Sequence, residues 1–112
     1  MRIAIPLVQG QLSLHFGHCD QFALIDVDVE TKNIIERKDA APPAHEPGAL
    51  PAWLGANNVD LIIAGGMGQR AQQLFEQKGI KVVVGASSGE PQDLVAAYFD
   101  GSLKTGDNFC DH

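Results

Sequence analysis

The second half of the chain alternates short apolar runs with segments of helical pattern, and this alternation constrains the fold most strongly. Residues 59–64 form a mainly aliphatic run that is closed by Gly65 and Gly66. A glycine-terminated helix is predicted over 69–78, and residues 80–84 form another aliphatic run. A strand–helix–strand unit makes its two strands parallel, with a right-handed crossover. The sequence therefore predicts an α/β domain with parallel strands.

The first half predicts a β-hairpin next to a further strand. Residues 2–8 are an apolar run, and residues 22–29 are rich in β-branched and aromatic side chains. A polar turn at 30–33 leads to a third predicted strand at 34–38. Because hairpin strands are antiparallel, the sheet as a whole must be mixed. We expect a three-layer α/β fold with a mixed five-stranded sheet and an N-terminal β-hairpin.

Two further helices are predicted at 47–56 and 90–98, each with a proline in its first turn. The chain has 112 residues, of which 45% are hydrophobic, and such a chain can bury a working core as one domain. Residues 100–112 show little periodicity. We predict a single α/β domain over residues 1–99 and a C-terminal tail over 100–112 that carries Cys110 and His112.

Charge and hydropathy exclude several classes of partner. Acidic residues number 14 and basic residues 8, so the net charge is −6, and no cluster of lysine and arginine occurs. A nucleic-acid binder needs a positive stripe, so we expect no nucleic-acid partner. No apolar run approaches the roughly 20 residues that cross a bilayer, and the stretch before Pro6 is too short for a signal peptide. We expect no membrane partner and a cytoplasmic protein with reduced cysteines.

Most histidine and cysteine side chains gather in two short windows, at 15–19 and 110–112. Imidazole and thiolate donors suit zinc, copper(I) and iron–sulfur species. The pattern therefore predicts a metal site. The first candidates for its ligands are Cys19, His18, Cys110 and His112, and the second are His15 and His45.

The predicted topology brings the loop at 9–18, the loop that carries His45 and the turn at 65–68 to the carboxyl ends of the parallel strands. Open α/β sheets bind ligands at this edge. The tail starts at the opposite edge, and about 11 residues at ~3.3 Å each are long enough to return. We expect the tail to bring its donors back to the same edge.

The turn Gly-Gly-Met-Gly at 65–68 joins a strand to a helix. Backbone N–H groups at a helix start attract anions, and glycine also allows a helix to pack tightly on the sheet. Met67 either supplies a thioether or fills space. The turn is neither a dinucleotide fingerprint nor a P-loop. The residues expected to line a cofactor pocket are Gly65, Gly66, Met67, Gly68 and Arg70.

The sequence offers few arrangements of residues that could catalyse a reaction. Cys19 lies beside His18 and Asp20, which suggests an activated thiolate, but adjacent residues of a strand point to opposite faces, so His18 is badly placed as a base. We therefore expect no enzyme. A thiol enzyme that uses Cys19 and a zinc-stabilised interaction module are the alternatives to a metal-cluster protein.

Four segments, at 1–6, 15–22, 60–68 and 97–103, together resemble the dinitrogenase iron–molybdenum cofactor biosynthesis family in its small stand-alone form. The loop Phe-Gly-His and the turn Gly-Gly-Met-Gly are the most specific parts. The resemblance implies a ribonuclease H-like fold without nuclease activity. It also implies a nitrogenase accessory role: the protein holds an iron–sulfur or molybdenum-containing cluster precursor and passes it to a cofactor-assembly partner protein.

Overall fold

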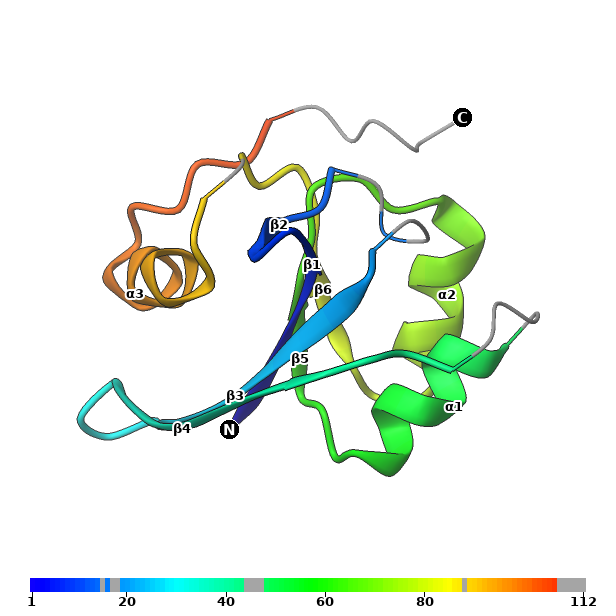
Figure 1. Ribbon diagram of the computed structural model, residues 1–112, viewed down its shortest axis with the longest axis horizontal. Coiled ribbons are helices and arrows are strands. Elements are labelled where there is room, and N and C mark those ends of the chain that lie inside the picture. Colours follow the sequence, from blue (N-terminus) through cyan, green and yellow to red (C-terminus); the bar gives the residue numbers. More distant parts are fainter. Residues whose placement is uncertain (15, 17–18, 44–47, 88, 107–112) are drawn as a thin grey trace.

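The computed structural model describes residues 1–14, 16, 19–43, 48–87 and 89–106 (Figure 1). Its elements are β1 (Arg2–Val8), β2 (Gln11–Leu12), β3 (Gln21–Asp28), β4 (Asn33–Ala40), α1 (Ala49–Ala56), β5 (Leu61–Ile63), α2 (Gln69–Gln77), β6 (Lys81–Val83) and α3 (Pro91–Asp100). The strands form one six-stranded sheet, in which the order is β4–β3–β1–β5–β6 and β2 pairs with β1. None of the described helices has the length and apolar character needed to span a membrane.

The mixed sheet is confirmed. β1 pairs antiparallel with β3 and parallel with β5, and β5 pairs parallel with β6. β3 and β4 form the predicted hairpin, with a bulge between Asp26 and Val27. The carboxyl ends of β1, β5 and β6 therefore lie at one edge of the sheet.

The prediction of five strands was wrong by one, because it missed β2. Leu7 pairs with Gln21 of β3 and also with Leu12 of β2, so β2 lies on the opposite edge of β1 from β3. β5 pairs with this same edge of β1 nearer the start of β1, at Ile3 and Ala4. β2 follows a two-residue loop in which Gln9 (φ 54°) and Gly10 (φ 82°) both have positive φ, as in a type I′ hairpin. A two-residue strand leaves no periodicity in a sequence.

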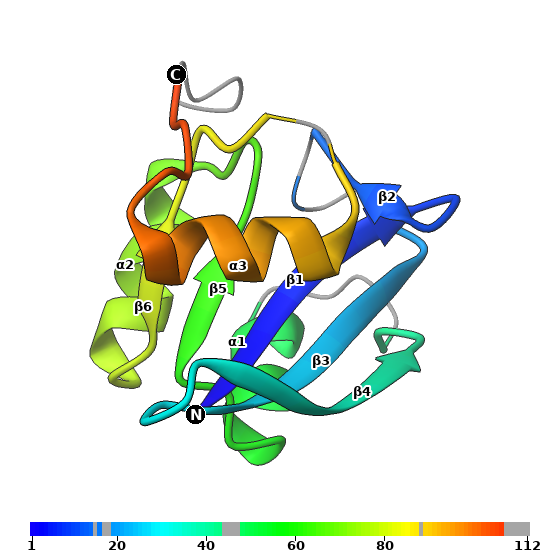
Figure 2. The same cartoon turned by 90° about the vertical axis from the view of Figure 1, so that its left-hand side faces the viewer.

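Two apolar cores lie on the two faces of the sheet, which confirms three layers. α3 covers one face, and α1 and α2 cover the other (Figures 1 and 2). Because strand side chains alternate, Ile3 and Ile5 of β1 pack on the α3 side, whereas Ala4 packs on the α1 and α2 side. Leu54 of α1 and Phe75 of α2 complete the second core.

The chain after α3 runs back toward the carboxyl ends of the parallel strands. Gly101 (φ 80°) ends α3 in the left-handed conformation that commonly terminates helices. Leu103 then packs against the core on the α3 side, and Thr105 forms an antiparallel bridge with Ala86, just beyond β6. We expected the tail to return to the carboxyl ends of the parallel strands, and the structure shows this return as far as Gly106.

Candidate functional site

Four backbone segments meet at the carboxyl ends of β1, β5 and β6, and we call this place the carboxyl edge. They are the described parts of the loop 9–20, the turn 64–68, the loop 84–87 and the tail 103–106. Both views place them at the same end of the molecule (Figures 1 and 2). The sequence predicted the first two segments there.

Main-chain hydrogen bonds join these segments in a row. The Gly106 N–H donates to the Gly85 carbonyl at 2.6 Å, and the Gly85 N–H donates to the Gly65 carbonyl at 2.6 Å. The Phe16 N–H donates to the Gly66 carbonyl at 2.8 Å. The carboxyl edge is therefore held by backbone groups that run from the N-terminal loop to the tail.

Two glycines allow this close approach. A Cβ on Gly85 (φ 82°) would lie 2.3 Å from the carbonyl oxygen of Gly106. A Cβ on Gly65 would lie 3.0 Å from the carbonyl oxygen of Ser13 and 3.1 Å from Cα of Leu14. Larger residues at either position would force backbone segments apart. The sequence showed Gly85 only as the end of a strand, and its contact with the tail could not be read from sequence spacing.

Phe16 anchors the N-terminal loop in the core. Its ring packs edge-on against Phe22 at 5.6 Å and against Phe75 at 5.5 Å between ring centroids. Only 5% of its surface is exposed. Together with the main-chain bond to Gly66, this packing fixes one residue inside the window 15–19.

Cys19 is buried in the core on the α1 and α2 side, with 6% of its surface exposed. Burial raises the pKa of this thiol to about 11, and the nearby charge of Asp20 acts in the same direction. A buried thiol of this kind is protonated at neutral pH and is a poor nucleophile. An activated catalytic thiolate needs the opposite, a lowered pKa.

The glycine turn leads into α2 as predicted. Gly68 is the N-cap residue, and its extended backbone has no side-chain cap. Met67 is 1% exposed and packs in the core on the α1 and α2 side, while Gln72 Nε2 donates to its carbonyl at 3.0 Å. Arg70 is exposed in the first turn of α2 and forms no ion pair within the described parts of the chain. The start of α2 therefore combines helix N–H groups with one uncommitted cation.

Of the six predicted metal ligands, Cys19 is within the described part of the chain. The other five lie outside the described residues: His15, His18, His45, Cys110 and His112. Within the described ranges, no group of three or more histidine, cysteine, aspartate or glutamate side chains could hold a metal ion.

Comparison with known proteins gives a consistent family assignment. A family model described as dinitrogenase iron–molybdenum cofactor matches residues 1–101. An uncharacterised protein of Methanocaldococcus jannaschii is 32% identical over 108 residues, which cover 93% of this chain and 90% of that protein.

Two solved structures share the fold. The crystal structure of PH0822 has a TM-score of 0.85 at 30% identity, and the match covers 94% of each chain. The apo form of the orange protein from Desulfovibrio gigas has a TM-score of 0.71 at 22% identity, over 96% of this chain and 93% of that one; this second likeness is one of fold alone. From the extent of the family match, this chain belongs to the dinitrogenase iron–molybdenum cofactor family.

Proposed function

We propose that this protein holds a metal–sulfur cluster or its precursor, of the iron–sulfur or iron–molybdenum type, and delivers it to a partner protein during cofactor assembly. The protein acts as a carrier, and no reaction is catalysed on the cargo. Family membership supports a role in the biosynthesis of the iron–molybdenum cofactor. The carboxyl edge is the proposed binding site.

The docking of the tail carries this proposal. The bond from Gly106 N–H to the Gly85 carbonyl fixes the start of the tail at the carboxyl edge. Four residues lead from Gly106 to Cys110, and four residues of extended chain span at most about 14 Å. The proposal requires this short segment to bring Cys110 to the loop that contains the window 15–19.

Local charge favours an anionic cargo at this edge. The chain as a whole carries a charge of −6, which would repel an anion, so binding needs a local positive potential. The start of α2 supplies it together with the guanidinium of Arg70, which forms no ion pair among the residues that the structure describes. Metal–sulfur precursors are anionic, and mixed thiolate and imidazole donors on loops suit reversible binding.

If Cys19 is a ligand of the cargo, its thiol must lose a proton when the cargo binds. Metal ligation needs the thiolate, whereas burial keeps this thiol protonated. Cargo binding by Cys19 therefore releases a proton and becomes more favourable as the pH rises.

Anaerobic reconstitution tests the proposal. The purified protein is supplied with iron and sulfide, or with tetrathiomolybdate, and the charge-transfer absorption is recorded. We expect wild type to take up a chromophore that Cys19→Ala and Cys110→Ala each weaken and that the double variant loses. Equal uptake by wild type and the double variant would show that neither thiolate is a ligand. One tightly held zinc ion in the protein as purified would instead favour the zinc-stabilised module.

We also infer a ribonuclease H-like classification for the fold. The strand order β4–β3–β1–β5–β6, with β3 antiparallel to its neighbours β1 and β4, supports this assignment.

A further inference from the structure

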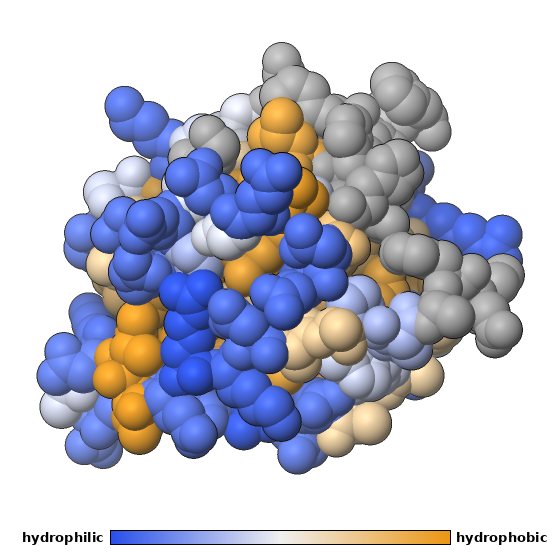
Figure 3. Space-filling view, in the orientation of Figure 1, coloured by the Kyte–Doolittle hydropathy of each residue, from blue (hydrophilic) through white to orange (hydrophobic). Residues whose placement is uncertain are grey.

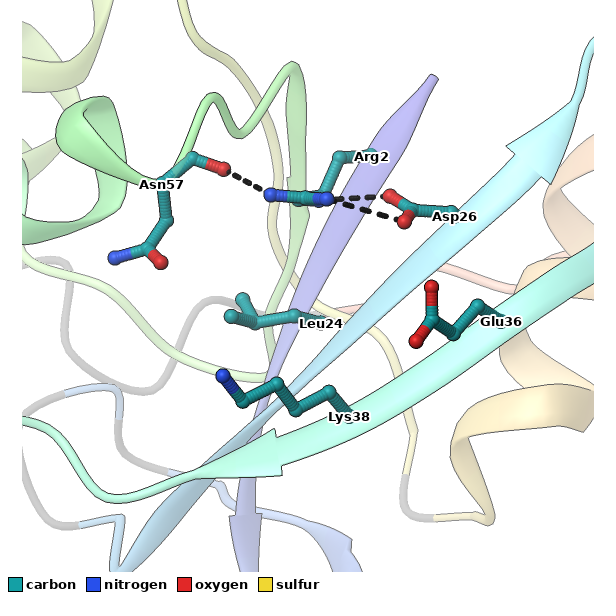
Figure 4. A pocket seen from close by; sticks show the side chains of 6 residues that line it. All are labelled: Arg2, Leu24, Asp26, Glu36, Lys38 and Asn57. Atoms are coloured by element: carbon teal, nitrogen blue, oxygen red, sulfur yellow. Dashed lines mark hydrogen bonds and ion pairs between the residues drawn. The ribbon is translucent and has the colours of Figure 1, made fainter.

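An open cavity of about 120 Å³ lies between β4 and the C-terminal end of α1, over β1 and β3 (Figure 4). It is lined by Arg2, Leu24, Asp26, Glu36, Lys38 and Asn57. Strand pairing explains the shared face, because Leu24 is opposite Lys38, and Asp26 is opposite both Glu36 and Arg2. The volume equals about four water molecules, which suits a ligand of very few heavy atoms.

One side of the cavity is a fixed and neutral ion pair. Arg2 Nε donates to Asp26 Oδ1 at 2.7 Å, and Arg2 Nη2 donates to Asp26 Oδ2 at 3.1 Å. Arg2 Nη1 donates to the carbonyl of Asn57 at 2.6 Å, which ties the pair to the end of α1. A bidentate pair with a third bond is geometrically rigid. Its charges satisfy each other, so this side of the cavity is preorganised.

The other side carries two charges of opposite sign, of which Glu36 acts on Arg2 through its charge alone. Glu36 and Lys38 are two residues apart on β4 and share one face. Neither forms a hydrogen bond or ion pair with any part of the chain that the structure describes. Figure 4 shows the Lys38 ammonium on the Leu24 side of the cavity and the Glu36 carboxylate on the side of Asp26. The surface over β4 is mainly hydrophilic (Figure 3).

We propose that this cavity binds a small zwitterion of the amino-acid type. The ligand carboxylate binds the ammonium of Lys38, the ligand ammonium binds the carboxylate of Glu36, and a short side chain lies over Leu24. The balance of charge favours this choice: the cavity has two cations and two anions, and one of each forms no ion pair or hydrogen bond among the described residues. A simple anion would face Glu36 unpaired, and a simple cation would face Lys38 unpaired.

Leu24 forms the apolar floor of the cavity and is 6% exposed. A floor of this kind leaves room for a methyl or hydroxymethyl group and penalises a charged side chain, which would lose hydration there. Glycine, alanine and serine are therefore preferred to aspartate or lysine. The site is at β4 and the end of α1, away from the carboxyl edge, so it is independent of the proposed carrier function.

Amide chemical shifts measured by NMR test this proposal. The ¹⁵N-labelled full chain is titrated with glycine and with L-alanine at constant ionic strength, and with acetate and ethylammonium as ligands of single charge. We expect saturable shifts at the amides of Leu24, Glu36 and Lys38, with a dissociation constant on the order of millimolar, as for a very small ligand. Acetate and ethylammonium should bind at least about tenfold more weakly.

Variants identify the groups that bind. Lys38→Met and Glu36→Gln should each weaken glycine binding at least about tenfold. The hairpin offers a matched control pair, because Glu30 and Lys32 have the same spacing in the β3–β4 turn but do not line the cavity. Glu30→Gln and Lys32→Met should leave glycine binding unchanged. Shifts that do not saturate, equal binding of acetate, or unchanged binding in both cavity variants would each overturn the proposal.

Discussion

Gly85 and Gly106 lie in direct main-chain contact although 20 residues lie between them: the Gly106 N–H donates to the Gly85 carbonyl at 2.6 Å. A Cβ on Gly85 would come within 2.3 Å of the Gly106 carbonyl oxygen. The contact fixes the start of the tail beside the turn that leads into α2. Substitution of Gly85 therefore tests whether the tail and the carboxyl edge act together, whereas a Cβ on Gly106 would meet only the Gly85 carbonyl oxygen, at 3.9 Å.

Gly85→Ala should destabilise the protein and detach the tail. The alanine side chain meets the backbone of Gly106, and positive φ adds strain, so we expect a loss of about 2–4 kcal/mol in the free energy of unfolding. Urea denaturation measures the loss, and faster hydrogen exchange at the Gly106 amide reports the detachment.

Gly79→Ala is the matched control for this substitution. Gly79 also has positive φ (74°), but a Cβ there would have no heavy atom within 4 Å. Its cost should be about 1 kcal/mol, from backbone conformation alone. Equal losses in the two variants would show that the contact with Gly106 contributes nothing to stability.

Phe16→Ala should be among the more damaging substitutions in the N-terminal loop. The ring fills a space between Phe22 and Phe75, and its removal leaves a cavity that costs about 3–4 kcal/mol. Phe99→Ala is the comparison, because Phe99 is only half-buried and should cost less. The midpoints of urea unfolding give both values. A smaller loss for Phe16→Ala than for Phe99→Ala would contradict the anchoring role.

Cys19 should react slowly with alkylating agents in the metal-free protein. Its pKa is raised from 9.0 to about 11, and two pKa units lower the thiolate fraction at pH 7 about 100-fold. The Cys110→Ser variant leaves Cys19 as the single thiol for a test with iodoacetamide. Labelling in urea provides the rate for the exposed thiol. Comparable rates in the folded and unfolded protein would refute the burial of this thiol.

Asp26→Asn should change the stability of the protein in acid. The hydrogen bond and charge of Arg2 lower the pKa of the Asp26 carboxyl, so the folded protein holds a carboxylate where the unfolded chain begins to bind a proton. The contribution is complete above the ordinary value of 3.8 and is lost as the pH falls through the lowered folded pKa. Because the ion pair is partly exposed, Asp26→Asn should lower the free energy of unfolding by about 1 kcal/mol at neutral pH. It should also make stability fall less steeply as the pH decreases.

Arg2→Met is the matched change for the acid experiment. It removes the larger of the two groups that lower the pKa of Asp26, while the N-terminal ammonium remains as the other, so the fall of its stability in acid should flatten less than that of Asp26→Asn. A double-mutant cycle of Arg2→Met and Asp26→Asn then yields the coupling energy of the pair. If stability still falls steeply with decreasing pH in both single variants, the loss of stability in acid arises from other carboxylates.

The strands and helices with strong patterns could be predicted from the sequence. The apolar run of β1 appears with the predicted boundaries, and the β3–β4 hairpin and the β5–α2–β6 unit appear with boundaries shifted by at most two residues. Such shifts arise because pairing at the end of a strand depends on its neighbours. β2 could not be predicted, since its two residues form a strand only because β1 offers a free edge above the end of β5.

The sequence predicted which segments meet at the candidate site, but it did not predict which of their side chains are buried. Strand direction placed the turn 65–68 and the loop before Cys19 at one edge, and the main-chain bond from Phe16 to Gly66 confirms this. The burial of Cys19 and of Met67 depends on packing by α1 and α2, which spacing along the chain does not reveal. The cavity beside β4 joins Arg2, Glu36 and Asn57, and no local motif connects them.

The tail is attached to the body through main-chain atoms at Gly106 and Gly85, and the side chains of Lys104 and Thr105 are exposed. An attachment of this kind places no demand on the chemical identity of the residues that follow. Under the proposed carrier function, the terminal donors can therefore be exchanged, and the preferred metal with them, while the scaffold that presents them stays the same.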